Sequence, residues 1–322
     1  MNKLLRKIAI SLIVIFISGS FAACSETAGD IESGLKDTTV NTNEINASET
    51  DTAGTPIIND MIKCIYYNDS EFMQSIMNAQ KVKPDSGNIV GGIVPHHLLA
   101  CDLIASFFKT VSGENYDYVV VIAPNHKREG SRLINTAFEN WSTHFGVLES
   151  DGELIKSITG LKAADSKARL LEEEHSVSSI VPYIKYYLPN VKIVPILLHG
   201  NYGMKNSIEL GHKIYNNISQ KKALVIASVD FSHYLPPEKA DMMDEITLKA
   251  IKAWDIGAIS QMTNDNMDSP PSIMTLLTVM KDAGTDEFKL LGHDNSARIA
   301  KTYSDSTTSY FTGIYKRKKQ EN

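Results

Sequence analysis

The sequence predicts an α/β fold, a central sheet with helices on both faces. Three short apolar runs have the length and the β-branched composition of buried strands: Gly91–Val94, Tyr118–Ala123 and Ala223–Ser228. Segments with helical spacing of apolar residues alternate with these runs, as in βαβ units. Each run is followed within five residues by a histidine. Since open sheets of this kind bind ligands at the carboxyl ends of their strands, the same pattern predicts a site there.

The amino-terminal residues 1–23 have the pattern of a lipoprotein signal peptide. A basic start, MNKLLRK, precedes an apolar run over Ile8–Phe21 that is short for a membrane span, and Phe21-Ala22-Ala23-Cys24 resembles a cleavage site. We therefore expect a lipid on Cys24 that holds the mature chain at the extracytoplasmic face of the cell membrane. An ordinary cleaved peptide and an uncleaved anchor remain alternatives.

Composition divides the rest of the chain. Residues 24–55 are rich in Thr, Asn, Ser and acids and poor in large aliphatics, so we expect a disordered acidic tether. Residues 56–316 suit one sizeable α/β domain, and 317–322 form a basic tail. Loss of Lys3, Arg6 and Lys7 with the signal would lower the formal net charge from −6 to −9. This charge and the lack of a basic stripe argue against nucleic-acid binding, and the run Lys316–Lys319 is explained by a solvated chain end.

Within the domain, apolar periodicity places the elements in order. Helices are predicted over 69–80, 98–111, 177–187, 205–218, 239–254 and 272–281, and further strands over 191–198, 288–291 and 310–315. Beyond Cys24 the chain has two cysteines, Cys64 and Cys101. They form either one bridge or two buried thiols, because two cysteines define no disulfide framework.

The histidines after the first two strands, His96 and His126, are candidate metal ligands. One histidine beside an apolar run is more often a hydrogen-bonded packing residue. Several imidazoles at one edge of a sheet are better explained by a metal, of which neutral imidazole is the commonest protein ligand.

Two further groups are candidates for acid–base catalysis. Asp230 and His233 lie three residues apart on the turn after the third strand, close enough to orient one another for proton transfer. His175 follows three glutamates in LEEEHS, and Ser176 is a suitable N-cap that would hold His175 at a helix entrance. The acidic run is equally well explained as a solvated loop or first turn.

The other histidines have surface or packing explanations; they are His144, His199, His212 and His293. The sequence has no glycine-rich phosphate loop, Walker pattern or GxSxG elbow.

The ordered motifs VPHH, APNH, WSTHFGVLESDGEL, EEHSVSSIVPYI, VPILLHG, ASVDFSHY and SDSTTSYFTGIY resemble the Memo family, known in prokaryotes as AmmeMemoRadiSam system protein B. The resemblance spans Gly91–Tyr315. Memo proteins are similar in fold to class III extradiol dioxygenases, so the resemblance implies a mixed sheet between helix layers and a pocket of strand-end loops. It also implies a functional link to radical-SAM and AMMECR1-like proteins.

The family's metal-site histidines fall on His96 and His126. Where many Memo proteins have a cysteine as third ligand, this chain has Asp268, just before Pro270. Two histidines and one carboxylate are the facial triad that binds iron(II) with open positions. The same set suits zinc with a bound water, and manganese and copper are further candidates. Alternatively, Asp268 caps the helix that begins near Pro270.

Three functions are compatible with these residues. The first is a mononuclear metal enzyme with redox or dioxygenase-like chemistry on a small substrate, with His233, His175 and Asp230 as catalytic groups. The second is a surface lipoprotein that binds metal without turnover, and the third is a module that binds a peptide in the pocket. Dioxygen chemistry would be excluded in an anaerobic cell.

Overall fold

The computed structural model describes residues 61–160, 164–286 and 288–318. Nine of its strands form one sheet, in which β2, β9, β3 and β8 are neighbours and run parallel. On one side β12 pairs antiparallel with β2, β10 and β11, and on the other side β4 pairs antiparallel with β8 and parallel with β7. In spatial order the strands are β10 (Phe231–Leu235), β12 (Thr307–Lys316), β2 (Ile89–Val94), β9 (Ala223–Ser228), β3 (Tyr118–Pro124), β8 (Lys192–Leu198), β4 (Ile134–Thr136) and β7 (Ala164–Ser166), with β11 (Lys289–Asn295) beside β12. The predicted α/β class with a mixed sheet is confirmed.

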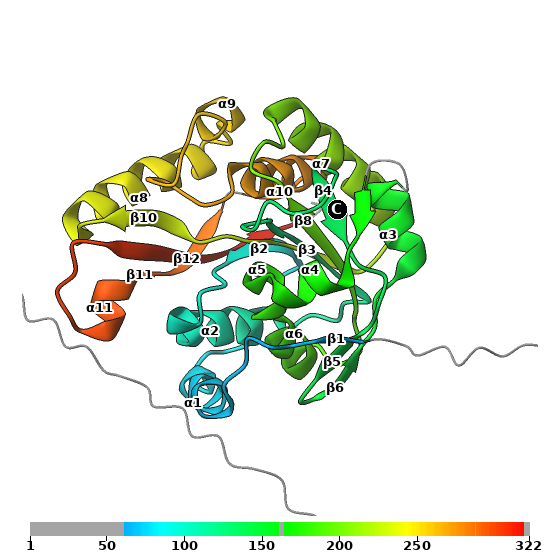
Figure 1. Ribbon diagram of the computed structural model, residues 1–322, viewed down its shortest axis with the longest axis horizontal. Coiled ribbons are helices and arrows are strands. Elements are labelled where there is room, and N and C mark those ends of the chain that lie inside the picture. Colours follow the sequence, from blue (N-terminus) through cyan, green and yellow to red (C-terminus); the bar gives the residue numbers. More distant parts are fainter. Residues whose placement is uncertain (1–60, 161–163, 287, 319–322) are drawn as a thin grey trace, which may run out of the picture. The chain divides into compact units, whose positions relative to one another are not determined.

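Helices cover both faces of this sheet (Figure 1). One layer contains α1 (Asp69–Ala79), α2 (Cys101–Val111) and α6 (Val181–Tyr187), with a small second sheet of β1 (Ile62–Lys63), β5 (Trp141–Thr143) and β6 (Gly146–Leu148). The other contains α3 (Gly152–Thr159), α7 (Met204–Ile218) and α10 (Pro270–Asp282). The remaining helices are η1 (Leu98–Ala100), α4 (Ala168–Glu173), α5 (His175–Ser178), α8 (Pro237–Lys252), α9 (Ile256–Ile259) and α11 (Ser296–Ala300).

Strand β3 shows why its sequence is apolar without interruption. Val119 and Val121 belong to the core under α2 and α6, whereas Val120 and Ile122 belong to the core under α7 and α10. Because successive side chains of a strand point to opposite faces, a strand buried on both faces must be apolar at every position.

The two adjacent glycines of β2 allow both helix layers to approach the sheet. A Cβ atom on Gly91 would lie 2.4 Å from the sulfur of Met280 in α10. On the opposite face, a Cβ on Gly92 would lie 2.6 Å from the Phe107 ring in α2. Side chains here would therefore push the helices off the central strand.

The long predicted elements are present, with two differences. The helix expected over 177–187 is two shorter helices, α5 and α6, of which α6 has Pro182 in its first turn. The expected turn after β9 is short, and His233 lies within a strand, β10, that pairs with β12.

Cys64 and Cys101 are both free thiols, so no bridge joins them. Burial raises the pKa of Cys64 to about 12 and that of Cys101 to about 11, which makes both unreactive at neutral pH. The predicted signal peptide, Cys24 and the acidic tether lie outside the described residues, and the domain bounds stay a prediction. Among the described helices, none has the length and apolar character needed to cross a membrane.

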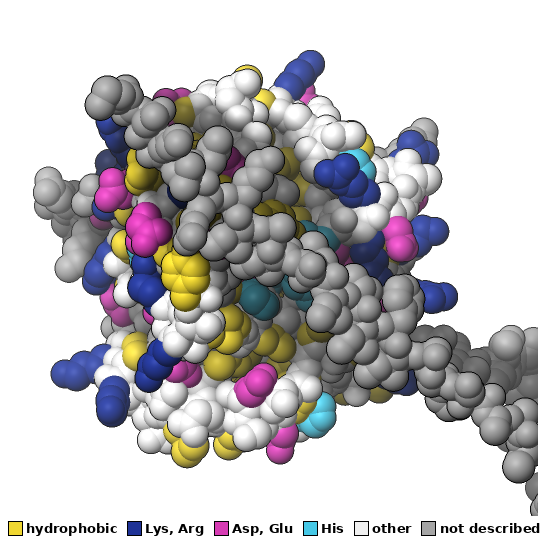
Figure 2. Space-filling view, turned by 60° about the vertical axis from the view of Figure 1, so that its left-hand side comes forward, with side chains coloured by type: hydrophobic (Ala, Val, Ile, Leu, Met, Phe, Trp, Pro, Cys, Tyr) yellow, Lys and Arg dark blue, Asp and Glu magenta, His cyan; other side chains and the backbone are white. Residues whose placement is uncertain are grey.

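On the face seen in Figure 2, Lys and Arg side chains are dispersed and interspersed with Asp and Glu rather than arranged in a stripe. The prediction that the protein does not bind nucleic acid stays a prediction.

Candidate metal centre

Three neighbouring parallel strands each present a candidate ligand two residues beyond their last residue. His96 follows β2, Asp230 follows β9, and His126 follows β3. Because the three strands run in the same direction, these side chains meet at the carboxyl edge of the sheet.

Asp268 joins this group from the loop before α10. Its Oδ2 atom lies 3.2 Å from Nε2 of His96 and 3.3 Å from Nε2 of His126. The backbone N–H of Asp268 donates to the carbonyl of Asp230 at 3.1 Å, which fixes this loop against the end of β9. The helix cap of α10 is Ser269, whose hydroxyl accepts from the N–H of Ser272. The structure therefore gives the capping role to Ser269 and leaves the carboxylate of Asp268 facing the two imidazoles.

The hydrogen bonds behind each imidazole determine which ring nitrogen carries the proton. The hydroxyl of Ser228 donates to the carbonyl of Ser176 at 2.6 Å, so its oxygen accepts from Nδ1–H of His96 at 3.2 Å. Nδ1 of His126 lies 2.9 Å from Oε1 of the fully buried Glu174, which accepts its proton. When each ring is neutral, its lone pair is therefore on Nε2, the atom that faces Asp268. A carboxylate behind a histidine in this way is typical of metal ligands.

Three observations fit this group to a divalent cation. Two ligands on one tetrahedral ion, each at about 2.05 Å, are separated by about 3.3 Å, which is the spacing of Asp268 from each histidine taken singly. Around this carboxylate, the sets whose ligand atoms all lie within 4.8 Å of one another are His96–His126–His175 and His96–Asp230–Asp268, so His96 is common to both and the predicted triad is divided between them. The other oxygen of Asp268, Oδ1, is buried and has no hydrogen-bond partner among the described residues. The carboxylates of Asp230, Asp268 and Glu174 are all buried. Among the described residues, their only ion-pair partners are histidines. A bound cation would compensate this buried negative charge.

Without a cation, protons compensate it. Burial lowers the pKa of His126, but hydrogen bonds to Asp268 and Glu174 outweigh burial and raise it to about 10. For His96 burial is likewise outweighed, chiefly by the charge of Asp230, and the pKa is raised. Burial raises the pKa of Glu174, but the His126 hydrogen bond and charge lower it to about 2. The pKa of Asp268 is lowered in the same way by both histidines.

His175 lies next to the predicted ligands. Its ring stacks on His126 with centroids 4.6 Å apart and planes 18° apart, and lies 5.1 Å from the His96 ring. A ligating nitrogen of each of these three histidines lies within 4.8 Å of the others. Burial and the neighbouring His96 and His126 lower the pKa of His175 to about 4, so this ring is neutral at pH 7.

The predicted cap of this helix is wrong. Glu174, and not Ser176, is the N-cap of α5, and its side chain accepts the N–H of Ser176. The Ser176 hydroxyl donates to the carbonyl of Pro124. Nor is the acidic run a uniformly solvated face, because Glu174 is fully buried and Glu173 pairs with Lys127. Sequence reasoning missed Glu174 as the hydrogen-bond partner of His126, and its position directly before His175 was the available signal.

A cavity of about 170 Å³ opens beside the centre, lined by His126, Asp268 and His233. Nδ1 of His233 is buried and without a partner among the described residues, and burial lowers the pKa of this ring. Two rim residues, Arg128 and Tyr234, have left-handed backbones with φ of 52° and 61°. Such conformations are costly for side chains of this size and are concentrated at functional sites.

The other histidines have partners of their own. His144 stacks on Tyr67, and His212 pairs with Asp282. His293 forms a second acidic group with Asp244 and Asp241, in which the Asp241 carboxylate already accepts two hydrogen bonds from Arg298.

Fold and site define an α/β protein with a buried histidine–carboxylate group at the carboxyl edge of a mixed sheet. The family model for Memo-like proteins matches residues 65–314, and the chain belongs to this family. A MEMO1 family protein of Pyrobaculum aerophilum is 30% identical over 240 residues, which cover 72% of this chain and 85% of that protein. A MEMO1 family protein of Methanothermobacter thermautotrophicus is 29% identical over 227 residues, which cover 68% of this chain and 78% of that protein.

Among solved structures, an uncharacterized protein from Escherichia coli K12 aligns with a TM-score of 0.47 and 11% identity. The alignment covers 70% of this chain and 99% of that protein.

Proposed function

We propose that this protein binds one divalent metal ion through His96, His126 and Asp268 and uses it in chemistry on a small substrate. One observation carries the proposal: a single oxygen of Asp268 faces Nε2 of both histidines, while each Nδ1 is engaged from behind. Asp230, whose Oδ2 lies 3.6 Å from Nε2 of His96, is a further ligand candidate.

The donor set favours iron(II). Two imidazoles and one carboxylate suit non-haem iron and leave positions open, whereas copper(I) prefers thiolate or thioether. The place of the family's cysteine is occupied here by Asp268. Zinc and manganese remain alternatives, because the same three ligands can hold a hydrolytic zinc.

A bound iron(II) would supply redox chemistry, and a bound zinc would supply an activated water. The neighbouring imidazoles would handle protons. His175 is neutral at pH 7 and stacks almost parallel to His126. A histidine binds metal through a nitrogen in its ring plane, so two nearly parallel stacked rings are poorly placed to bind one ion together. Because Glu174 accepts from Nδ1 of His126, we assign His126 as the ligand and His175 as the base. His233 lines the cavity that would hold the substrate, and its Nδ1 has no partner among the described residues.

The test is purification of the full chain without oxygen, metal analysis, and reloading with iron(II), zinc or manganese. We expect one ion per chain and a spectral change when a small substrate enters the site. His233→Gln should retain the metal and lose the substrate-dependent change. Metal bound at one per chain with no response to any small ligand would favour metal storage or transfer over catalysis. Absence of bound metal under every loading condition would overturn the proposal.

A further inference from the structure

A second cavity lies at the amino-terminal ends of the parallel strands, opposite the ends that carry the proposed metal centre. Its volume is about 370 Å³, within the range of about 300–1,000 Å³ typical of small-molecule sites. It is bounded by Asn88 before β2, Ala223 at the start of β9, and Arg317 after β12. Because the metal-site residues follow the other ends of β2 and β9, the length of a six-residue strand, about 20 Å, separates the two sites.

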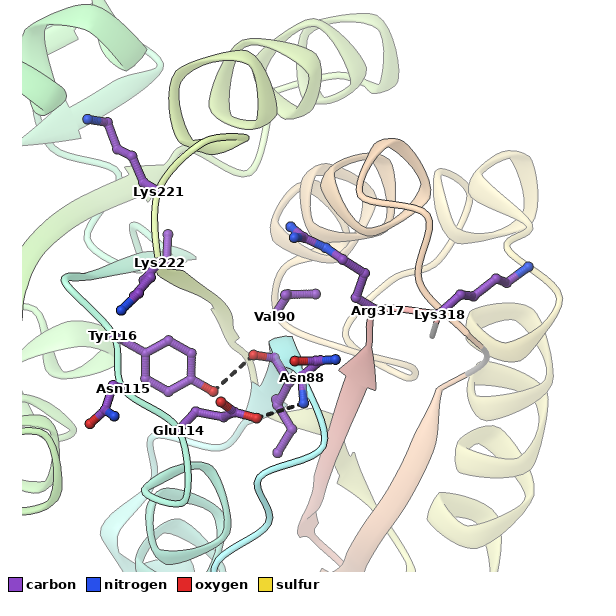
Figure 3. A pocket seen from close by; sticks show the side chains of 11 residues that line it. Asn88, Val90, Glu114, Asn115, Tyr116, Lys221, Lys222, Arg317 and Lys318 are labelled. Atoms are coloured by element: carbon purple, nitrogen blue, oxygen red, sulfur yellow. Dashed lines mark hydrogen bonds between the residues drawn. The ribbon is translucent and has the colours of Figure 1, made fainter. Parts of the chain in front are cut away.

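Four cationic residues line this cavity from two distant parts of the chain. Figure 3 shows Lys221 and Lys222 on one side, and Arg317 and Lys318 on the other, with the side chains of Lys221 and Lys318 extending away from the space between the two walls. The Nζ atom of Lys221 lies 5.3 Å from the centroid of the Tyr118 ring. Within the described residues, none of the four forms an ion pair with a carboxylate. The one acidic side chain lining the cavity is Glu114, and its Oε1 already accepts the backbone N–H of Asn88 at 2.6 Å.

The basic run near the carboxyl terminus is therefore more than a solvated chain end. Lys316 is structural, because its Nζ pairs with Asp85 at 2.6 Å. Arg317 and Lys318 are held at the cavity by their backbones: the N–H of Arg317 donates to the carbonyl of Asn88 at 2.9 Å, and that of Lys318 to Gly284 at 3.3 Å.

The opposite wall is fixed in the same way. The carbonyl of Lys222 accepts the N–H groups of Asp117 and Tyr118 at 2.7 and 3.2 Å. The hydroxyl of Tyr116 donates to the carbonyl of Ile89 at 3.0 Å and closes the floor. The backbones that carry Lys222 and Arg317 thus form a rigid frame, so little backbone entropy would be lost when a ligand binds.

We propose that this cavity binds the phosphate group of a small anionic molecule. An arginine offers a planar pair of donors that matches two phosphate oxygens, and lysines add strong point charges. A compact basic cavity on a protein of net negative charge favours a small ligand over a long polyanion. The phosphate can belong to a soluble phosphate ester or to the headgroup of an anionic lipid.

The experiment uses the full chain with Cys24→Ala, so that no N-terminal lipid contributes to vesicle binding. The pocket variant is Lys222→Gln with Arg317→Gln, and the matched control is Lys205→Gln with Arg132→Gln, two exposed cations outside the cavity. Binding of inorganic pyrophosphate is measured by calorimetry, and binding to phosphatidylglycerol and phosphatidylcholine vesicles by sedimentation. Metal content and circular dichroism check that each variant is folded.

We expect the pocket variant to weaken binding by about tenfold or more, because each charge-assisted hydrogen bond contributes about 1.5–3 kcal/mol and 1.4 kcal/mol is a factor of ten. The control should bind as the parent does. If the pocket variant loses the pyrophosphate binding seen in the parent chain, the ligand is a soluble phosphate ester. If it loses only the binding to phosphatidylglycerol vesicles, the ligand is a lipid headgroup. Equal binding by the pocket and control variants, or no binding of either probe by the parent chain, would overturn the proposal. Neither result bears on the metal centre.

Discussion

Glu174 holds His126 at two points. Its Oε2 accepts the backbone N–H of His126 at 2.8 Å, and its Oε1 accepts from Nδ1 of the same residue at 2.9 Å. The carboxylate therefore fixes both the position and the tautomer of the imidazole, and it does so from a fully buried place. Residues 48 positions apart in the chain thus act as one unit at the edge of the sheet.

Glu174→Gln should weaken metal binding by about 10- to 100-fold, the usual cost of losing a carboxylate behind a histidine ligand. A glutamine cannot accept both hydrogen bonds. Competition with a chelator of known affinity measures the change. Glu173→Gln, which alters the neighbouring surface pair with Lys127, is the control and should bind metal normally. Equal affinity of the two variants would contradict the role given to Glu174.

Asp268 and Ser269 should separate metal binding from helix capping. Asp268→Asn should lower metal affinity and also destabilise the metal-free protein, because it removes the carboxylate that pairs with both histidines. Ser269→Ala should cost about 1 kcal/mol of folding free energy with the metal retained. Denaturant unfolding of the metal-free proteins and metal analysis measure the two effects. Asp268→Cys should also shift metal selectivity toward copper(I). The assignment of roles fails if Asp268→Asn retains the metal at the parent affinity, or if Ser269→Ala loses it.

Metal binding should release protons and strengthen with pH beyond the usual histidine range. In the metal-free protein the pKa of His126 is raised to about 10, so at pH 7 this ring carries a proton that a metal must displace. Apparent affinity should therefore still rise about tenfold per pH unit for each displaced proton between pH 7 and 8.5. Calorimetry in buffers of different ionisation enthalpy counts the protons. An affinity that levels off near pH 6.5 would show that His126 has an ordinary pKa.

The lipid anchor remains a proposal based on the first 24 residues. Cys24→Ala should release the chain from the membrane fraction, because lipid on Cys24 is the proposed attachment. Fractionation with and without detergent measures this. A cleaved Cys24→Ala chain that still needs detergent for release would contradict lipid anchoring.

The sequence was sufficient to predict the elements whose pattern is local. The apolar runs of β2, β3 and β9 predict buried strands, and the residues that follow them meet because parallel strands end at one edge. Short strands such as β4 and β7 were not predicted, since three residues are too few for a periodicity. β4 pairs with β8 and β7 pairs with β4, so both depend on contacts between segments that are distant in the chain.

The site shows the same limit. Asp268 was selected through family resemblance, and no local pattern indicates that its carboxylate reaches both histidines. The role of Glu174 depends on a contact across 48 residues. The basic cavity likewise brings together Lys222 and Arg317, which are 317 − 222 = 95 positions apart. Such contacts arise from tertiary packing and leave no periodic signal in the sequence.

The most direct test of the central claim is metal stoichiometry in protein purified and reloaded without oxygen. We expect about one divalent ion per chain in the parent protein and in His212→Ala, which removes a surface histidine paired with Asp282. His96→Ala and His126→Ala should each lose the ion while retaining the fold by circular dichroism. If either of these two variants still binds metal at the parent stoichiometry and affinity, the metal centre is not the one described.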